Sequence, residues 1–250
     1  MTRHLLISYP KSGRTWLRFL LNHAVCQHHN LTPRNVFEIE KGHTAYPFEW
    51  THLTAAMVMQ LPYWSMGCFD AKQLAGLRAF LLVREPRATL ASAYFQATNR
   101  IRVFQGTPSE FVRSEKYGAI KLATFFNLWN NVRHLFADTL VLNYQDMLDE
   151  PEPALHALLN FLDMPMDNAT VNAAIDAASF ENMKKLSVTP EYAGTVIAPT
   201  DPNNPDSAKV RSGKKTGYRD LFSDQDIQYI DTVMDAVCTT MPQPSACSVA

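Results

Sequence analysis

The chain has 250 residues, 46% of them hydrophobic, which is enough to bury the core of one α/β domain. Its 23 basic and 24 acidic residues leave a formal net charge of −1, which excludes recognition of nucleic acid or of an anionic membrane through bulk charge. The four cysteines show no C-x-x-C spacing, and no stretch has the pattern of a signal sequence or a membrane span, so we expect a cytoplasmic protein with free thiols.

Apolar runs and helical spacing predict strands that alternate with helices along the chain. Short continuous apolar runs are typical of buried parallel strands, and apolar residues three or four apart are typical of helices that cover a sheet. In chain order, these patterns predict a strand at 5–9, a helix at 15–25, a weaker strand at 48–52, a strand at 80–83, a helix from about residue 88, a helix at 122–136 and a strand at 139–143. A helix follows after Pro151, with apolar positions up to residue 162, and further helices are predicted at 168–178 and 227–237. Ser223 and Asp226 form the pattern of a capping box before the last helix.

This order predicts an α/β fold with a mainly parallel central sheet flanked by helices, formed as a single domain over residues 1–250. In such sheets, ligands bind beyond the carboxyl ends of the strands, and Lys11 and Arg84 both follow a predicted strand. Residues 188–208 are rich in Pro, Asn, Asp and Thr, a composition that favours a mobile loop, and we expect this loop to act as a lid.

The segment Tyr9–Trp16 places a lysine, two hydroxyl groups and a glycine between the first strand and the first helix. Backbone N–H groups at a helix N-terminus, together with the helix dipole, favour a phosphate at such a place. Lys11 precedes Gly13, whereas the Walker A pattern G-x-x-x-x-G-K-[ST] has its lysine after the second glycine. The segment therefore predicts a phosphate site that is not a Walker A loop.

The order Y-P-K-S-G-R-T-W resembles the 5′-phosphosulfate loop, Y-P-K-[SA]-G-[TN]-T-W, of the sulfotransferases that use 3′-phosphoadenosine-5′-phosphosulfate (PAPS). The resemblance implies a P-loop-like site, PAPS as cofactor and 3′-phosphoadenosine 5′-phosphate (PAP) as its product. The cofactor residues that it implies in this loop are Lys11, Ser12, Gly13, Arg14, Thr15 and Trp16. Arg14 stands where the family usually has Thr or Asn, and its side chain could reach either the cofactor or the acceptor.

A second segment, which runs from Arg84 to Tyr94, resembles the family's 3′-phosphate element, R-x-P-R-x-x-x-x-S-x-Y. A guanidinium at a strand end and the Ser92 hydroxyl in the following helix can converge on one phosphate, with the arginine as a bidentate donor. The resemblance thus implies that Arg84 and Ser92 bind the cofactor. Arg87, taken alone, is expected to be a solvated surface charge.

Three further segments resemble the parts of the family that enclose the nucleotide. Tyr144 lies in a segment similar to Y-E-D-[LM], with Gln145 in place of the glutamate, and would face the adenosine. The segment 179–183 is similar to S-F-x-x-M, whose aromatic and thioether groups enclose the adenine. The segment after Val210 looks like the R-K-G element that closes over the 3′-phosphate, with a serine in place of the lysine. The cofactor residues implied by these three segments are Tyr144, Ser179, Phe180, Met183, Arg211, Ser212 and Gly213.

The expected reaction is an in-line displacement at sulfur, in which negative charge builds on the bridging oxygen, so positioning and electrostatic stabilisation should supply most of the catalysis. Lys11 is expected to neutralise that oxygen, and Ser12 to hold Lys11 or the phosphosulfate. The family commonly uses a histidine as general base, and His52 is favoured over His43 because it follows a threonine at a predicted strand end. A histidine that is simply satisfied within the fold is the alternative. No metal ion is expected.

The expected partner is a small-molecule acceptor with a hydroxyl or an amine, and its identity does not follow from the sequence. We expect no nucleic-acid or membrane partner, and a poor match to the family's dimer segment leaves a monomer and a homodimer both open. Two other functions stay open as alternatives. One is a P-loop-type nucleotide or small-molecule kinase, and the position of Lys11 argues against it; the other is a catalytically inactive nucleotide-binding domain.

Overall fold

The computed structural model describes residues 3–40, 48–67, 71–201, 203–209 and 216–242. Contacts divide the chain into two compact units, each of which combines segments that are distant in sequence. The sheet unit comprises Met1–Ser12, Glu49–Tyr144 and Lys214–Ser245, and the helical unit comprises Gly13–Phe48, Gln145–Gly213 and Ala246–Ala250. The interpretation of the whole chain as one domain stays a prediction.

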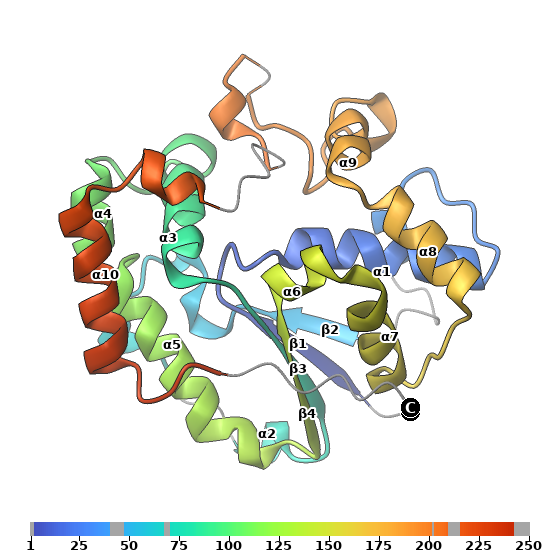
Figure 1. Cartoon of the computed structure of the whole chain (residues 1–250), viewed down its shortest axis with the longest axis horizontal. Helices are drawn as coiled ribbons and strands as arrows, with labels where there is room; N and C mark the ends of the chain where they lie inside the picture. Colours follow the sequence, from blue (N-terminus) through green and yellow to red (C-terminus); the bar gives the residue numbers. More distant parts are fainter. Residues whose placement is uncertain (1–2, 41–47, 68–70, 202, 210–215, 243–250) are drawn as a thin grey trace. The chain divides into compact units, whose positions relative to one another are not determined.

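The central sheet has four strands in the order β2-β1-β3-β4 (Figure 1). The strands are β1 (His4–Ser8), β2 (Phe48–Thr51), β3 (Arg78–Val83) and β4 (Asp138–Asn143). β3 pairs in parallel with both β1 and β4, and Phe80 lies opposite Leu6 on one side and Leu140 on the other. The predicted α/β fold with a mainly parallel sheet is therefore confirmed.

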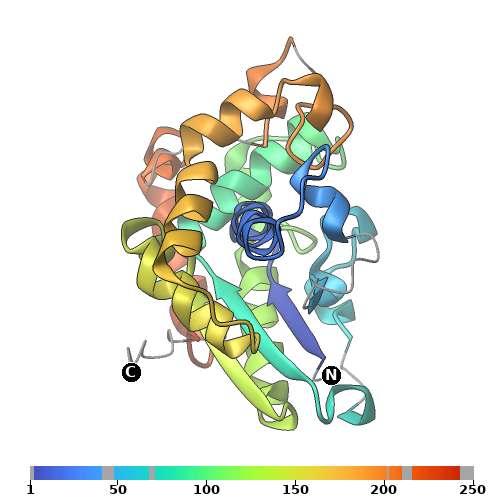
Figure 2. The same cartoon turned by 90° about the vertical axis from the view of Figure 1, so that its right-hand side faces the viewer.

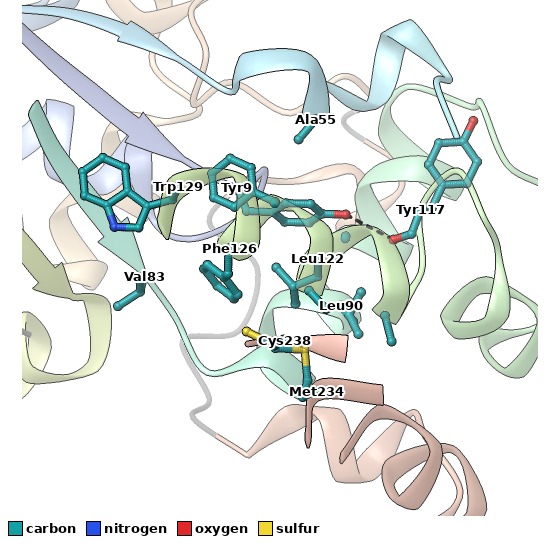
Figure 3. Packing of buried hydrophobic residues seen from close by; sticks show 14 of the residues in the cluster. Tyr9, Ala55, Val83, Leu90, Tyr117, Leu122, Phe126, Trp129, Met234 and Cys238 are labelled. Carbon is teal, nitrogen blue, oxygen red and sulfur yellow. Dashed lines mark hydrogen bonds between the residues drawn. The ribbon is translucent and has the colours of Figure 1, made fainter. Parts of the chain in front are cut away.

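Helices of the sheet unit pack into one large apolar core. These helices are α2 (Ala71–Leu74), α3 (Pro86–Phe95), α4 (Pro108–Arg113), α5 (Ala119–Val132) and α10 (Asp224–Val237), with a π-helical turn at Gln96–Arg100 and 3-10 helices at Leu53–Ala55, Met57–Met59, Tyr63–Ser65, Arg133–Leu135 and Gly217–Asp220. Figure 3 draws Tyr9 and, from α5, Phe126 and Trp129 as members of this core, and all three side chains are almost completely buried. The Tyr9 hydroxyl donates to the carbonyl of Tyr117 at 3.3 Å, so the residue that opens the segment Tyr9–Trp16 is anchored in the core.

The helical unit is assembled around α1. Figure 2 views this helix along its axis. Its elements are α1 (Arg14–His28), α7 (Pro151–Phe161), α8 (Asn168–Ala177), α9 (Phe180–Leu186) and 3-10 helices at Val36–Glu40, Pro190–Tyr192 and Pro205–Ser207, while α6 (Tyr144–Asp149) begins at the last residue of the sheet-unit segment. α1 packs against α8 and against the first of the 3-10 helices. A buried ion pair between Arg18 of α1 and Glu40 fastens that 3-10 helix to α1, and the Asn22 side chain donates to the same carboxylate at 2.8 Å.

One predicted helix begins earlier than expected, and another is shorter. α3 begins at Pro86 because the Glu85 carboxylate accepts hydrogen bonds from the N–H groups of Arg87 and Ala88, at 3.0 and 2.7 Å. Proline fits the first turn of a helix because its missing N–H has no partner there in any case. The helix predicted at 122–136 ends as an α-helix at Val132 and tightens into a 3-10 turn.

The segment 188–208, predicted as a mobile lid, contains two 3-10 helices in its described part, Pro190–Tyr192 and Pro205–Ser207. Ser207, the last residue of the second 3-10 helix, forms two hydrogen bonds with the backbone of Asp201. Its hydroxyl donates to the carbonyl of Asp201 at 2.8 Å and accepts from the N–H of Asp201 at 3.1 Å. That the segment moves as a lid stays a prediction.

The free thiols expected from the sequence are present at Cys26 and Cys238, which are buried, and burial raises the pKa of both. The other two cysteines, Cys68 and Cys247, lie outside the described residues. Among the residues that the structure describes, no helix has the length and the apolar run needed to cross a bilayer. Over the same ranges, no three His, Cys, Asp or Glu side chains come together as a metal site would require.

Candidate active site

The chain turns sharply between β1 and α1. Lys11 has a φ of 75° and Gly13 a φ of 100°, so both adopt the left-handed conformation, which only glycine takes without strain. The N–H of Ser12 donates to the carbonyl of Tyr9 at 3.3 Å, and α1 then begins at Arg14. The first turn of α1 has no acidic side chain and no side-chain cap, so the positive end of its dipole favours an anion.

Lys11 is held through both its backbone and its side chain. Its carbonyl accepts a hydrogen bond from Nη1 of Arg84 at 3.0 Å, and its Nζ donates to Oε1 of Gln96 at 3.4 Å. Ser12, the next residue, is only 1% exposed. The structure therefore brings together Lys11 and Arg84, which belong to two separate sequence motifs.

Arg84 and Tyr144 each follow a neighbouring strand and meet at the carboxyl edge of the sheet. The Cζ atom of Arg84 lies 4.9 Å from the centroid of the Tyr144 ring, which is a cation–π contact. Burial lowers the pKa of Arg84, and the charges of Tyr144 and Glu85 act against that shift. Burial raises the pKa of Tyr144, and the positive charge of Arg84 opposes that rise. The strand ends thus present a largely buried cation with an aromatic ring against it.

α3 carries the two other polar residues of the second motif. Ser92 is partly exposed, and its hydroxyl forms no hydrogen bond with the residues that the structure describes. Arg87 instead donates from Nε to Asp231 of α10 at 2.7 Å, and its Cζ lies 5.9 Å from the ring centroid of Tyr218. The hydrogen bond to Asp231 raises the pKa of Arg87. Arg87 is therefore a partly exposed charge, 32% exposed, that is paired with a carboxylate of α10.

His52 follows β2, and its ring orientation is fixed by the backbone of β1. Nδ1 of His52 lies 2.7 Å from the carbonyl oxygen of Ser8. Because a carbonyl can only accept, Nδ1 carries the proton in the neutral ring, and Nε2 is then the basic nitrogen. The competing histidine, His43, and three of the predicted cofactor residues, Arg211, Ser212 and Gly213, lie outside the described residues.

The remaining predicted residues belong to the helical unit. They are Gly13, Arg14, Thr15, Trp16, Phe180, Ser179 and Met183. The indole Nε1 of Trp16 donates to the carbonyl of Ala178 at 2.9 Å, which brings the first turn of α1 beside the segment that starts α9. The Ser179 hydroxyl caps α9 by accepting from the N–H of Asn182 at 3.4 Å. Met183 is only 4% exposed. Within this unit, the structure therefore groups the first turn of α1 with the segment that resembles S-F-x-x-M.

Gln96, which contacts Lys11, was not predicted from the sequence. It follows the second motif and begins the π-helical turn after α3. The spacing could have found it, because Gln96 is four residues after Ser92 and residues at that spacing share one face of a helix. No pattern in the sequence, however, connects Gln96 with Lys11.

Comparisons with known proteins agree with these motifs. The family model described as "Sulfotransferase domain" matches residues 1–242. Among curated proteins, the chain is 27% identical over 179 residues to WSCD family member GA21586 of Drosophila pseudoobscura pseudoobscura, an alignment that covers 68% of this chain and 53% of the relative. It is 24% identical over 215 residues to cytosolic sulfotransferase 15 of Arabidopsis thaliana, covering 74% of this chain and 59% of the relative. The chain thus spans a little more than half the length of these relatives.

Two solved structures share the fold. The mouse sulfotransferase SULT7A1, complexed with PAP, superposes with a TM-score of 0.65 at 17% identity and covers 96% of this chain and 86% of its own. Retinol dehydratase in complex with androsterone and inactive cofactor PAP superposes with a TM-score of 0.65 at 15% identity, covering 98% of this chain and 82% of its own. At this identity the likeness shows the fold.

Proposed function

Since the family model covers residues 1–242, the chain belongs to the sulfotransferase domain family, and we propose that it transfers a sulfonate group from PAPS to a small-molecule acceptor. The observation that carries this proposal is the hydrogen bond from Arg84 to the carbonyl of Lys11, 3.0 Å long. It joins the loop that resembles the phosphosulfate site to the segment that resembles the 3′-phosphate site. A single nucleotide that carries a 5′-phosphosulfate and a 3′-phosphate is the ligand that suits these two elements together.

In this proposal, the N-terminus of α1 and the loop before it bind the 5′-phosphosulfate. Gly13, with a φ of 100°, lets the backbone approach an anion closely, and the dipole of a 15-residue helix points its positive end at that anion. Lys11 supplies a full positive charge. The family resemblance adds the Thr15 hydroxyl, Arg14 and Trp16 as further contacts of the cofactor.

The remaining residues are proposed to bind the 3′-phosphate and the adenosine of the cofactor. Arg84 is largely buried, and a buried guanidinium interacts with a phosphate more strongly than one in water because the local dielectric is lower. The hydroxyl of Ser92, which lies on α3 after Arg84, is available as a second hydrogen-bond donor to this phosphate. The family resemblance assigns Arg211, Ser212 and Gly213 to the same phosphate, and Tyr144, Ser179, Phe180 and Met183 to the nucleoside.

The reaction needs only one bond to form and one to break at sulfur. The acceptor oxygen or nitrogen attacks the sulfur, the bond from sulfur to the bridging oxygen breaks, and PAP leaves with the electron pair of that bond. The ammonium of Lys11 stabilises the negative charge on the leaving oxygen. His52 takes the acceptor's proton on Nε2, because Nδ1 is engaged with Ser8. Ser12 holds the lysine or the phosphosulfate until the acceptor arrives.

The acceptor is proposed to be a small molecule with a hydroxyl or an amine. Retinol dehydratase, which shares this fold, has been solved with androsterone and with retinol, both of which carry a hydroxyl group. A cytoplasmic location belongs to the same proposal and is supported by the similarity to the plant cytosolic sulfotransferase.

The proposal is tested by isothermal titration of PAP into the protein in the presence of EDTA. We expect binding by the wild type in the micromolar range and a loss of about 10- to 100-fold in Arg84→Ala, the range for one hydrogen bond to a charged group. Arg133→Ala is the matched control, because Arg133 is exposed and lies in the same unit. Absence of binding by the wild type would overturn the proposal. A requirement for Mg²⁺ would point instead to a kinase.

A further inference from the structure

Gln96 lies where α3 changes into a π-helical turn. The turn comprises Gln96–Arg100 and is closed by a hydrogen bond from the N–H of Ile101 to the carbonyl of Gln96, at 2.9 Å. Turns of this kind are rare, and they occur often at functional sites. None of the motifs that resemble the sulfotransferase family includes this residue. Its side-chain oxygen nevertheless lies 3.4 Å from Nζ of Lys11.

The backbone of Gln96 is fixed on both sides. Its N–H points at the carbonyls of Ser92 and Ala93, and its carbonyl accepts from Ile101. Ser92 and Gln96 are four residues apart and lie on one face of the helix. The same helical face thus carries the hydroxyl proposed for the 3′-phosphate and the amide that contacts the catalytic lysine.

The backbone of Lys11 is fixed as well. Its left-handed φ of 75° is accompanied by the hydrogen bond from Arg84 to its carbonyl. Backbone strain of this kind persists only where the surroundings hold it. Any movement of the ammonium between the cofactor-free and cofactor-bound states is therefore confined to the lysine side chain, whose Nζ donates a hydrogen bond to Gln96.

The chemistry of an amide suits a temporary partner. An amide oxygen accepts a hydrogen bond from an ammonium but carries no charge, so Lys11 keeps its full positive charge. A hydrogen bond of 3.4 Å is long for its type and is weaker than an ion pair at the same place. A phosphosulfate that arrives with several negative charges can draw the ammonium away from Gln96, whereas a carboxylate at this position would compete with it.

We propose that Gln96 is a positioning residue that holds the Lys11 ammonium in the cofactor-free protein and releases it to the bridging oxygen when PAPS binds. This inference rests on the proposed function. Gln96 touches neither the cofactor nor the acceptor in this account, and it acts only through Lys11.

Two substitutions and one control test the inference. Gln96→Met keeps the length of the side chain and removes the acceptor, and Gln96→Glu replaces the acceptor with a carboxylate. Gln228→Met is the matched control, because Gln228 is an exposed glutamine on α10 of the same unit. Lys11→Arg identifies the Lys11 signal in nuclear magnetic resonance spectra of ¹⁵N-labelled lysine side chains.

The spectroscopic measurement needs no acceptor. In the cofactor-free protein, the Lys11 ammonium signal should differ between the wild type and Gln96→Met, and Gln228→Met should match the wild type. After saturation with PAP, the wild type and Gln96→Met should converge, because Lys11 has then left Gln96. A difference that is absent without PAP, or that persists unchanged with PAP, contradicts the inference.

The kinetic measurement separates binding from turnover, read as the release of PAP from PAPS. Gln96→Met should leave kcat within about 3-fold and should bind PAP at least as tightly as the wild type, because Gln96 contacts Lys11 only in the cofactor-free protein and this contact opposes cofactor binding. Gln96→Glu should weaken PAP binding by at least about 10-fold, because its charge competes for Lys11 and repels the phosphate.

The two proposals fail in different ways. If the wild type does not bind PAP, the proposed function fails and the release of Lys11 to PAPS fails with it, while the spectra without PAP still decide whether Gln96 holds Lys11. If the wild type binds and turns over PAPS but both Gln96 variants behave like Gln228→Met, the proposed function stands and this inference is wrong.

Discussion

Lys121 is a lysine enclosed by the core of the sheet unit, with an exposed fraction of 1%. Its Nζ donates to the carbonyl of Leu61 at 2.7 Å, which ties the segment of 3-10 helices after β2 to α5. Burial lowers the pKa of Lys121 from 10.5 to about 8. A neutral amine still donates to a carbonyl, so the tie survives deprotonation while the cost of burying a charge disappears.

This shift predicts that stability rises with pH between about 8 and 10.5. Between these pH values the unfolded chain holds a proton on Lys121 that the folded chain has lost. Below about pH 8 both states are protonated, and the folded state bears the full free-energy cost of burying the charged ammonium. Relative to Lys121→Met, the wild type should gain about 2 kcal/mol between pH 7.5 and pH 10, as measured by urea unfolding at a series of pH values.

The comparison must be made between variants, because other groups titrate in the same range. Burial raises the pKa of the Cys26 and Cys238 thiols and of Tyr9, so each of these lowers stability at high pH. They are shared by the wild type and the variant and cancel in the difference. Lys116→Met, at an exposed position, is the control. Parallel pH profiles for the wild type and Lys121→Met would show that Lys121 is not perturbed.

At this scale, the sequence predicted which residues follow strands but not what those residues touch. Lys11 and Arg84 were placed at strand ends by the apolar runs before them, and the structure confirms both positions. The hydrogen bond between them, and the contact of Lys11 with Gln96, join segments more than 70 residues apart in the chain. Local patterns carry no information on such pairs, because each partner looks like an ordinary polar residue in its own segment.

At the scale of elements, α1 combines an apolar surface with a buried polar network. The pattern predicted a helix at 15–25, and the structure extends it to Arg14–His28. Its Arg18 and Asn22 are buried because Glu40, on the 3-10 helix Val36–Glu40, accepts hydrogen bonds from both. The sequence could not predict this pairing, since charged residues near an apolar face usually reach solvent.

We expect Arg18→Met and Glu40→Met each to cost about 3 kcal/mol, because each leaves its former partner charged and buried without compensation. The double variant should be less destabilised than the worse single variant, since no buried charge then remains. Urea unfolding of all four proteins gives this double-mutant cycle.

An exposed ion pair is the control for this cycle. Arg3 pairs with Glu49 at 3.0 Å, with side chains 69% and 70% exposed, and Arg3→Met should cause no measurable change. If Arg18→Met is as harmless as Arg3→Met, the Arg18–Glu40 pair does not stabilise the fold.

Two of the helices that the structure describes begin with a capping box, and the sequence predicted one of them. The capping box of Ser223 and Asp226 was predicted and is present, with Asp226 buried. Burial alone would raise the pKa of Asp226, but hydrogen bonds from Arg113 and from two serine hydroxyls lower it to about 2. Thr107 and Glu110 form the same box before α4, which was not predicted. At Pro108–Arg113, that helix is too short for an apolar period to be seen.

At the scale of the whole molecule, the class of fold was predictable and the arrangement was not. Alternating strands and helices indicate a parallel sheet, since parallel neighbours need crossover connections. The strand order β2-β1-β3-β4 departs from chain order, because β1 lies between β2 and β3 and is not an edge strand. The two compact units interleave distant segments, and no composition change in the sequence marks their boundaries.

Sulfonate transfer from PAPS is tested most directly with PAPS that is radiolabelled in its sulfonate group. The wild type is incubated with a panel of small alcohols, phenols and amines, and labelled products are separated. Lys11→Ala is compared with Lys116→Ala, an exposed lysine of the same unit. We predict a labelled product with the wild type and Lys116→Ala, and at least about a 100-fold lower rate with Lys11→Ala, which removes the charge that stabilises the leaving oxygen. Tight binding of PAP without transfer to any acceptor, unchanged by Lys11→Ala, would contradict the account and identify a nucleotide-binding domain without turnover.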